Sequence, residues 1–469
     1  MQDHLSKYYS SKAINLYMVA LLVCNIIFFN RVLGILWWIF GIAEVVLFFN
    51  FANQMTRKWT KLSVKKFPKK VFQTAFVIRL VWVVFSYFFY TIMTGKPFEF
   101  DAADSLGYHN SAQHVASMIN SGQLQHFFDS MRDNYSDMGY PLFLGIEYWI
   151  LGNSIFLTRI IKALIGAYTC VLIYKLTVRT FGEEIGRMAT IFCVLMPNLI
   201  YYCGIHTKEV EMVFITVAFM ERADLMFRNK NFNFIEIAPP LLLAVFMFFF
   251  RTVLGATAIF ALFTTLIFSS TKVLGMGKRI VLIVWILGAL SYFVGGKVSN
   301  EVEKTWSERK DNQSASMEFR SVRVNGNKFS KYASGAVFAP LIFIIPFPTV
   351  IETPQQENQK MINGGNYVKN IMAFFVVFAL FWIIKNKKWN ENVLMGSFLI
   401  GYLIVLALSA FAQSERFHQP VLPFELIFSA LGVSLITKKD NKYFTWYMGL
   451  LFVIMIGWSW FKLAGRGLV

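Results

Sequence analysis

Two aspartates that follow a long apolar segment have the chemistry of a general base. Asp101 and Asp104 belong to FEFDAADSLGYHNSAQHVA, directly after the apolar run 72–94. Tyr108 is four positions after Asp104, so a helix would place both on one face. A carboxylate there could accept the proton of an attacking hydroxyl. A structural explanation stays open: Asp104 would cap a helix that begins at Ser105, since aspartate is favoured at the N-cap, and Asp101 would be solvated.

Further ionisable side chains lie where later apolar segments begin or end. They are His206, Lys208, Glu209, Glu211, Arg251, Glu415, Arg416, His418 and Gln419. The arginines in FMFFFRTVLGA and SERFHQPVLPFE have apolar neighbours in the sequence and lie on the side where the carboxylates are expected. Cations beside an acidic centre at a membrane surface suit a lipid phosphate. For Arg159 and Lys162, near another such end, we expect snorkelling to the membrane interface.

The elements that must position these residues are membrane-spanning helices. Of the 469 residues, 56% are hydrophobic and 17% aromatic, and such a composition requires an apolar solvent. The net charge of +18 would indicate nucleic-acid binding in a soluble chain. Here, however, most Lys and Arg residues fall in short loops between apolar segments, where they contact anionic lipid headgroups. Membrane lipid is therefore an expected partner and nucleic acid is not.

The apolar runs predict an all-α polytopic protein with about thirteen transmembrane helices, each of roughly 17 to 25 residues. The predicted spans are 13–29, 33–52, 72–94, 154–177, 188–203, 208–227, 236–251, 253–271, 279–297, 368–385, 391–411, 420–437 and 444–462. The apolar run 336–350 contains Pro340, Pro346 and Pro348, which interrupt a helix. We expect this run to be re-entrant or interfacial.

The charge pattern predicts how the protein faces. RKWTKLSVKKFPKK, after Thr56, has seven basic residues and no acidic one, and basic loops stay on the cytoplasmic side. The long segments 95–153 and 298–367 then lie outside, together with the candidate site. Within the first of them, QLQHFFDSMRDNY and GYPLFLGIEYWILG are too short to span and predict juxtamembrane helices.

The order of these segments resembles the GT-C superfamily of polyprenyl-phosphate-sugar-dependent glycosyltransferases. The resemblance rests on DSLGYHNSAQHVASMINSG, GYPLFLGIEYWILGN, TRIIKALIGAYTCVLIYKLTVRTFG, a Pro-Asn helix that ends at YYCGIHTKE, an arginine-bearing helix and RFHQPVLPF. It is similar to the branch of protein mannosyltransferase-like and aminoarabinose transferase-like bacterial enzymes. The similar part would be a GT-C-like catalytic core, 72–437. Two additional helices and the basic cytoplasmic loop, 1–71, precede it, and a last helix, 438–469, follows.

The resemblance implies an inverting glycosyltransferase in the bacterial inner membrane, with its site facing the periplasm. It would move a sugar from a polyprenyl-phosphate carrier to a glycan, lipid or protein acceptor. Asp104 matches the family's base, with Asp101 as competitor because this chain has Asp-Ala-Ala-Asp where many relatives have adjacent Asp-Glu. Arg251 and Arg416, supported by Lys208 and His418, would hold the donor phosphate. The expected substrate contacts are Tyr108, His109, Tyr140, Glu209, Glu211 and Glu415.

Two questions stay open at this stage. No carboxylate and histidine cluster has clear metal-ligand spacing, yet Asp101, Asp104, His109, Glu209 and Glu211 could converge, so a divalent metal is neither predicted nor excluded. A lipid-linked polysaccharide polymerase, a ligase or a flippase, which use glycan-diphosphate lipids, would also need many spans and outward arginines. A secondary transporter would predict inverted repeats, and the sequence has no evident internal repeat.

Overall fold

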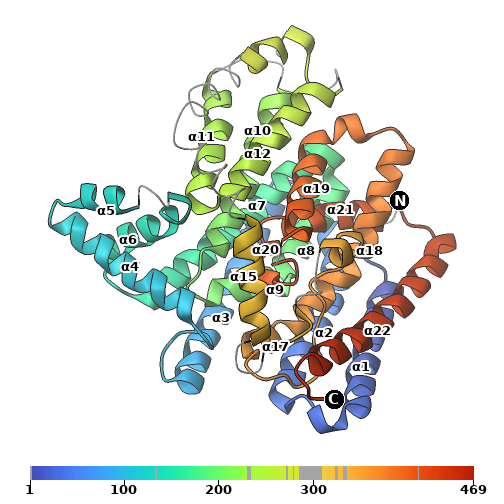
Figure 1. Ribbon diagram of the computed structural model, residues 1–469. Helices are drawn as coiled ribbons and strands as arrows, with labels where there is room; N and C mark the ends of the chain where they lie inside the picture. Colours follow the sequence, from blue (N-terminus) through green and yellow to red (C-terminus); the bar gives the residue numbers. More distant parts are fainter. Residues whose placement is uncertain are drawn as a thin grey trace.

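The computed structural model describes residues 3–131, 135–229, 234–270, 273–277, 279–284, 309–322, 326–330, 335–409 and 411–469. Throughout these residues the regular elements are helices (Figure 1), which confirms the all-α prediction for this part of the chain. The α-helices are α1 (Lys7–Ile27), α2 (Ile35–Trp59), α3 (Phe67–Thr94), α4 (Ala103–Asn120), α5 (Leu124–Ser130), α6 (Gly139–Leu151), α7 (Ile155–Phe181), α8 (Glu183–Leu195), α9 (Pro197–Tyr201), α10 (Glu209–Arg228), α11 (Phe234–Phe250), α12 (Thr252–Phe268), α15 (Arg309–Val322), α16 (Gly335–Phe338), α17 (Glu357–Met361), α18 (Asn363–Lys385), α19 (Val393–Ala407), α20 (Glu415–His418), α21 (Leu422–Leu435) and α22 (Asn441–Ala464).

Six of these helices are long and apolar enough to cross a membrane: α1, α2, α3, α7, α18 and α22. A seventh span results if α8 and the segment Pro197–Gly204, bent by 54° relative to each other, count as one. Helices α11, α12, α19 and α21 are apolar but shorter. The protein is therefore a helical, multi-pass membrane protein. The predicted number of thirteen spans is not confirmed, and most of the predicted span 279–297 lies outside the described residues.

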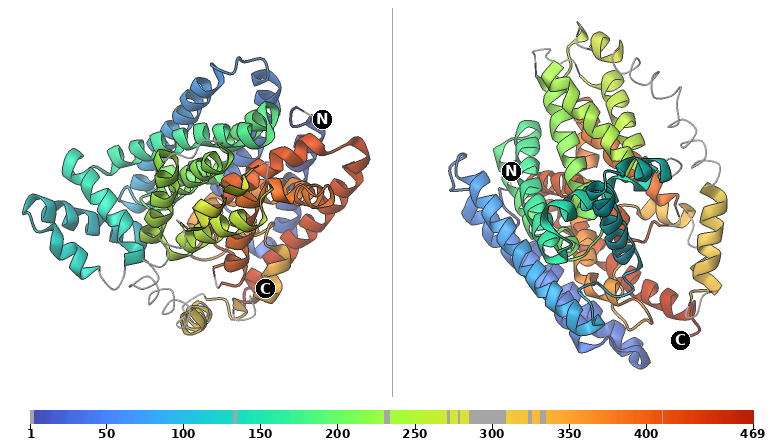
Figure 2. Two further views of the ribbon diagram at one scale, coloured as in Figure 1. Left: turned by 90° about the horizontal axis from the view of Figure 1, so that it is seen from above. Right: turned by 90° about the vertical axis from the view of Figure 1, so that its left-hand side faces the viewer.

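The long helices have apolar side chains on their outer surface. Large exposed apolar residues on α1, α2, α3 and α22 include Leu22, Ile26, Ile35, Ile39, Val77, Val81, Phe88, Ile92, Trp446 and Val453. Figure 2 shows α1, α2 and α3 along one flank of the molecule. Exposed apolar surface of this extent would be costly in water, so these faces are the ones that contact lipid.

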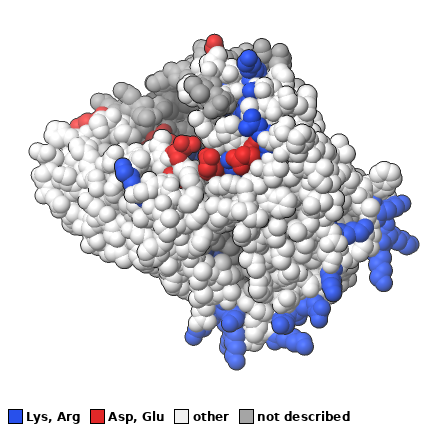
Figure 3. All heavy atoms as spheres, turned by 90° about the horizontal axis from the view of Figure 1, so that it is seen from below, with Lys and Arg blue, Asp and Glu red and all other residues white. Residues whose placement is uncertain are grey.

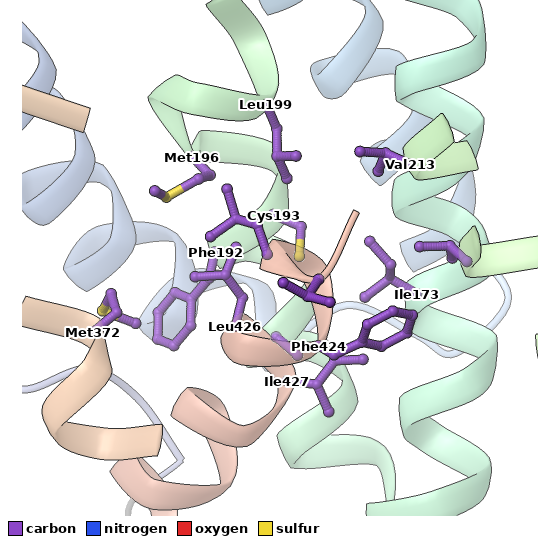
Figure 4. Close-up of a cluster of buried hydrophobic side chains, with 14 of the residues drawn as sticks. Ile173, Phe192, Cys193, Met196, Leu199, Val213, Met372, Phe424, Leu426 and Ile427 are labelled. Atoms are coloured by element: carbon purple, nitrogen blue, oxygen red, sulfur yellow. The ribbon is translucent and has the colours of Figure 1, made fainter. Parts of the chain in front are cut away.

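The interior of the bundle forms around α8, which is buried from Ile185 to Leu195. Its second half, from Met188 to Leu195, has only small or apolar side chains apart from Thr190, which suits such a central position. In Figure 4, Phe192 and Cys193 of α8 lie beside Leu426 and Phe424 of α21, with Ile173 of α7 nearby. Close backbone approaches tighten the same region: a Cβ at Gly432 would lie 2.1 Å from the carbonyl oxygen of Phe375. Small residues at helix contacts permit this packing in membranes.

Helices α4, α5 and α6 form a separate group beside the main bundle (Figure 1). α3 stops at Gly95, whose φ of 75° suits glycine, and the chain then turns into α4. α4 and α6 pack closely, since a Cβ at Gly145 would lie 2.4 Å from Cγ1 of Val115. The prediction that the segment after the third helix contains short helices is confirmed. Their position relative to the lipid surface stays a prediction.

The proline-rich run 336–350 contains no long helix. It forms α16 and the short turn Ala339–Leu341, and continues as irregular chain. The amide nitrogen of Asn370, on α18, donates to the carbonyl oxygens of Ile344 and Pro346. These contacts satisfy part of the irregular backbone inside the protein, as a buried loop requires. Within the described residues, this run therefore forms no helix long enough to span a membrane.

The two ends of the bundle differ in composition. At one end, Arg187 at the start of α8 donates to the carbonyl oxygens of Trp59 and Thr60, 2.8 and 3.0 Å away. Arg179 at the end of α7 pairs there with Asp224, at 2.6 Å. The basic loops that follow α2 and α7 thus lie together. The helix ends that carry the candidate site residues lie at the other end.

Candidate active site

Arg416 joins two carboxylates from distant parts of the chain. Its Nη1 contacts Oδ2 of Asp104 on α4, and its Nε contacts Oε1 of Glu209 at the start of α10. The Glu209 side chain is fully buried, whereas that of Asp104 is 61% exposed. Asp104 is therefore the carboxylate that a ligand from outside can reach.

Lys208 forms a second ion pair next to this one. Its Nζ lies 2.5 Å from Oδ1 of Asp137, in the turn before α6, and 2.9 Å from the carbonyl oxygen of Phe250. Lys208 is also 5.9 Å from the ring centroid of Tyr108. Asp137 was not among the residues expected from the sequence. It is one of several acidic residues in its loop, and nothing in the sequence indicates that it pairs with Lys208.

Arg251, which lies between α11 and α12, is close to the same residues. Its guanidinium lies 4.2 Å from the ring centroid of Phe417, the neighbour of Arg416. Its Nη1 is buried and has no hydrogen-bond partner among the described residues. We call Asp104, Tyr108, Asp137, Lys208, Glu209, Arg251 and Arg416 the polar cluster. The structure brings Asp104 and Arg416 into contact and places Arg251 beside Phe417, next to Arg416.

The structure corrects the alternative in which Asp104 caps a helix, and it agrees with the expectation that Asp101 is solvated. Helix α4 begins at Ala103 with Ala102 at the N-cap, so Asp104 lies in the first turn and does not cap a helix starting at Ser105. Its carboxylate contacts Arg416 instead. Asp101 is exposed, has φ of 48°, and forms no side-chain hydrogen bond with a described residue.

The predicted snorkelling of Arg159 and Lys162 is wrong. Both side chains are fully buried. Arg159 Nη2 donates to the carbonyl oxygen of Pro97 at 2.5 Å, and Lys162 Nζ donates to the carbonyl oxygen of Ile205 at 3.1 Å. Backbone carbonyls of irregular chain therefore hold both cations inside the protein, although Nε and Nη1 of Arg159 make no hydrogen bond with a described residue.

Glu211 and Tyr140 lie one layer deeper, around Lys162. The Lys162 Nζ is 3.7 Å from Oε2 of Glu211 and 3.3 Å from the Tyr140 hydroxyl, to which it donates. The Tyr140 ring packs edge-on against Tyr108, with centroids 4.9 Å apart. Tyr140 therefore packs against the polar cluster through Tyr108. Both Tyr140 and Glu211 are too buried to contact a substrate directly.

His109 belongs to a different group, with Tyr148 and His206. The Tyr148 hydroxyl lies 2.6 Å from Nδ1 of His109 and 3.0 Å from Nε2 of His206. Burial lowers the pKa of both imidazoles, so both are neutral near pH 7 and the hydroxyl can donate to only one of them. This group orders the start of α4 against α6 and the chain before α10.

The structure does not bring His418 or Glu415 into the polar cluster. His418 is buried with Nδ1 at 3.2 Å from Nζ of Lys369 and Nε2 at 2.8 Å from the carbonyl oxygen of Ala412. Glu415 lines a separate cavity, together with Gln413, Ser414 and Lys462. Adjacent positions on one short helix thus face different environments, which sequence spacing alone does not reveal.

The described residues contain no group of three or more His, Cys, Asp or Glu side chains arranged to hold a metal ion. Four of the five residues that could have converged contact other side chains: His109 contacts Tyr148, Glu211 contacts Lys162, and Asp104 and Glu209 share Arg416. The fifth, Asp101, is exposed. The side chains of the polar cluster therefore do not fit a metal, and no step of the chemistry below uses one.

Figure 3 shows acidic and basic side chains close together near the middle of one face of the molecule. Lys and Arg side chains alone project from an edge away from them. A surface with charges of both signs holds polar ligands by directed contacts, since the opposite charges largely cancel at long range.

The buried carboxyl group of Glu147, on α6, leads us to expect that the stability of the protein depends on pH. Burial, and secondarily the Glu211 carboxylate, raises the pKa of Glu147 to about 8 from 4.5, while Lys162 acts against the shift. The folded protein keeps a proton that the unfolded chain releases, so stability falls as the pH rises from about 4.5 to 8. We expect Glu147→Gln to raise the thermal midpoint at about pH 8.5 and to leave it nearly unchanged at about pH 4.5.

The control for this measurement is Glu184→Gln, at an exposed position of α8. Thermal unfolding in detergent would be recorded for both variants at the two pH values. An equal gain for Glu147→Gln at both would contradict the buried, protonated carboxyl.

No protein-family model, no curated protein and no solved structure matches this chain, so the polar cluster itself is the basis for assigning its function.

Proposed function

We propose that this protein is an inverting, GT-C-type glycosyltransferase. It moves a sugar from a polyprenyl-monophosphate carrier to a hydroxyl of an extracytoplasmic glycan, lipid or protein acceptor. The observation that supports this most directly is the polar cluster: an exposed carboxylate, Asp104, contacts Arg416, with Arg251 and Lys208 close to the same buried Glu209.

Asp104 takes the role of the general base. The acceptor oxygen bonds to the anomeric carbon from the face opposite the phosphate, and the bond between that carbon and the phosphate oxygen breaks. The hydroxyl proton passes to the Asp104 carboxylate, and polyprenyl phosphate leaves with the bonding electron pair. Back-face attack inverts the anomeric centre. A positioned base contributes roughly 10² to 10⁴ to such a rate.

The cations of the polar cluster stabilise the leaving phosphate. Arg251 forms no ion pair with a described carboxylate, and its buried Nη1 has an unused donor. Arg416 and Lys208 are held by carboxylates, which fix their position. Fixed donors stabilise developing charge because they need no rearrangement during the reaction. A phosphate oxygen that accepts from Arg251 would lie beside Phe417 and Arg416.

One further feature supports an extracytoplasmic site. The polar cluster is at the end of the bundle away from the basic loops that follow α2 and α7. By the positive-inside tendency those loops are cytoplasmic. We propose that the protein lies in the bacterial inner membrane, as the resemblance implies, with the polar cluster facing the periplasm. The long polyprenyl chain of the carrier lipid could then stay in the bilayer while its phosphate reaches the polar cluster.

Arg251→Gln is expected to weaken donor binding about tenfold to a hundredfold. The variant removes the charge that the phosphate would meet, and a hydrogen bond to a charged group contributes about 1.5–3 kcal/mol. Binding would be measured by calorimetry with polyprenyl-monophosphate mannose, glucose, galactose and arabinose, for the protein in nanodiscs. Arg222→Gln, a half-exposed arginine on α10 that contacts Glu221, is the matched control. Unchanged affinity in Arg251→Gln would remove Arg251 from the phosphate site.

The test of the function is transfer of a radiolabelled sugar by the purified protein. We expect product from a monophosphate carrier and a stoichiometric release of polyprenyl phosphate. Product only from a glycan-diphosphate lipid would instead indicate a polysaccharide polymerase or ligase. Movement of a lipid-linked sugar across the bilayer without bond formation would indicate a flippase.

A further inference from the structure

Arg79 is a buried arginine near the middle of a membrane-spanning helix. It is 1% exposed and lies on α3, about 18 Å from the start of that helix at 1.5 Å per residue. An ionisable side chain at such a depth is costly, and it persists where the protein interior gives it partners and a role. The transfer step described above does not use Arg79, so its contacts must indicate what it does.

The guanidinium of Arg79 joins α3 to the end of α8. Its Nη2 donates to the carbonyl oxygen of Cys193 at 3.3 Å, and its Nη1 donates to that of Val194 at 3.4 Å. Nη1 also lies 3.3 Å from the carbonyl oxygen of Ala75, one turn earlier on α3. Nε makes no hydrogen bond with a described residue, and Gly166 of α7 leaves room for it, since a Cβ there would lie 2.9 Å away. Three helices thus enclose this side chain.

The two carbonyl oxygens of α8 need a donor because the helix is interrupted directly after them. In a continuous helix the N–H groups of residues 197 and 198 would donate to Cys193 and Val194. Pro197 has no N–H group, and Met196 is extended, with ψ of 114°. Backbone groups inside a membrane protein must find partners within the protein, and the carboxyl end of a helix attracts a cation. Arg79 therefore supplies donors at the break between α8 and α9.

Two further polar side chains of α3 contact the chain that follows the break. Nε1 of Trp82 donates to the carbonyl oxygen of Tyr201 at 3.0 Å, and Oγ of Ser86 lies 3.4 Å from that of Gly204. Positions 79, 82 and 86 are three and four residues apart, so they lie on one face of α3. This face thus presents a row of polar groups to the irregular chain between α8 and α10.

The same irregular chain leads directly into the polar cluster. Lys162 of α7 donates to the carbonyl oxygens of Ile205 and Thr207, near its end. Lys208 is then the N-cap and Glu209 the first residue of α10. The path of the chain before them sets where α10 begins, so a movement of that chain would displace both charges.

We propose that Arg79 is a positioning residue of the transfer site. By holding the break between α8 and α9, it fixes the chain 196–207, so that Lys208 and Glu209 keep their places in the polar cluster. The role of this cluster in transfer rests on the proposed function, whereas the role of Arg79 in fixing the chain rests on its contacts alone. Without the guanidinium, the carbonyl oxygens of Cys193 and Val194 lose these donors, and the chain at the break can move.

The test compares hydrogen exchange and ligand binding in the wild type and in Arg79→Met, both in nanodiscs and well below their unfolding temperatures. We expect the amides of 197–208 to exchange at least about tenfold faster in the variant, with exchange elsewhere nearly unchanged. Calorimetry with polyprenyl monophosphate, the leaving group of the proposed reaction, should show at least about tenfold weaker binding. Arg79→Lys keeps the charge but offers one nitrogen to two carbonyl oxygens, so it should fold and show the same local change to a smaller degree.

Two controls accompany these variants. Lys70→Met removes a cation from an exposed position of α3 and should behave as the wild type does. Arg79→Met/Pro197→Ala restores an N–H group for the carbonyl oxygen of Cys193, so its thermal midpoint should rise above that of Arg79→Met. Binding of polyprenyl monophosphate should stay weak in this double variant, because α8 can then continue past residue 196.

Unchanged exchange of 197–208 in both Arg79 variants would overturn the proposal. An equal increase of exchange along the whole chain, or recovery of binding together with the thermal midpoint in the double variant, would assign Arg79 a general role in stability and would overturn it as well. A wild-type protein that binds no polyprenyl monophosphate would contradict the proposed function, and the exchange of 197–208 would still decide the role of Arg79.

Discussion

Replacing Asp104 with asparagine is expected to reduce sugar transfer by about 10² to 10⁴, with donor binding nearly unchanged. Asparagine has the same size and can still accept a hydrogen bond from Arg416, but it cannot take up a proton. The side chain is largely exposed, so the substitution leaves no cavity and buries no unpaired group. Initial rates with a saturating monophosphate donor, and donor affinity by calorimetry, would separate the two effects.

Asp101→Asn is the control for this experiment, because Asp101 lies three positions earlier and competes for the same role. Its carboxylate is exposed and bonded to no described side chain. We expect it to retain most of the activity. Full activity in Asp104→Asn together with loss in Asp101→Asn would transfer the role of base to Asp101.

Arg416→Met is expected to abolish detectable transfer and to destabilise the fold by about 3–5 kcal/mol. The substitution leaves the fully buried Glu209 carboxylate without the guanidinium that it contacts, and it removes a cation from the phosphate site. Thermal unfolding and donor binding, measured on the same preparation, would report the two effects.

The double variant Arg416→Met/Glu209→Gln separates stability from catalysis. Neutralising Glu209 removes the unpaired buried charge, so we expect most of the lost stability to return. Donor binding and transfer should stay low, because the cation is still absent. Recovery of transfer together with stability would show that Arg416 only supports the fold.

The sequence predicted the parts of the fold that depend on local composition. The apolar runs of α1, α2, α3, α7, α18 and α22 are long and uniform, so their existence follows from hydropathy. Proline explains the interruption of 336–350, and also the bend at Pro197. Pro239 and Pro240, by contrast, lie inside α11. In a membrane, neighbouring helices can satisfy the backbone groups that proline frees, and this depends on tertiary packing.

The polar cluster was predictable only in part. Asp104, Arg251 and Arg416 stand out because charged residues are rare beside apolar runs. Whether a charged side chain is buried in the protein or lies at the membrane interface cannot be read from hydropathy. Arg159 and Lys162 resemble interfacial residues in the sequence, yet backbone carbonyls of the chain before α4 and before α10 hold them inside the protein. Likewise, the order of Glu415 and Arg416 in the sequence does not reveal that the first lines a separate cavity and the second contacts Asp104.

Transfer of radiolabelled sugar from a polyprenyl-monophosphate donor, by purified wild-type protein and by Asp104→Asn, tests the central claim most directly. The account predicts an inverted glycosidic product and free polyprenyl phosphate with the wild type, and a rate lower by about 10² to 10⁴ with Asp104→Asn. Equal rates for the two proteins, or turnover with diphosphate-linked glycans only, would contradict it.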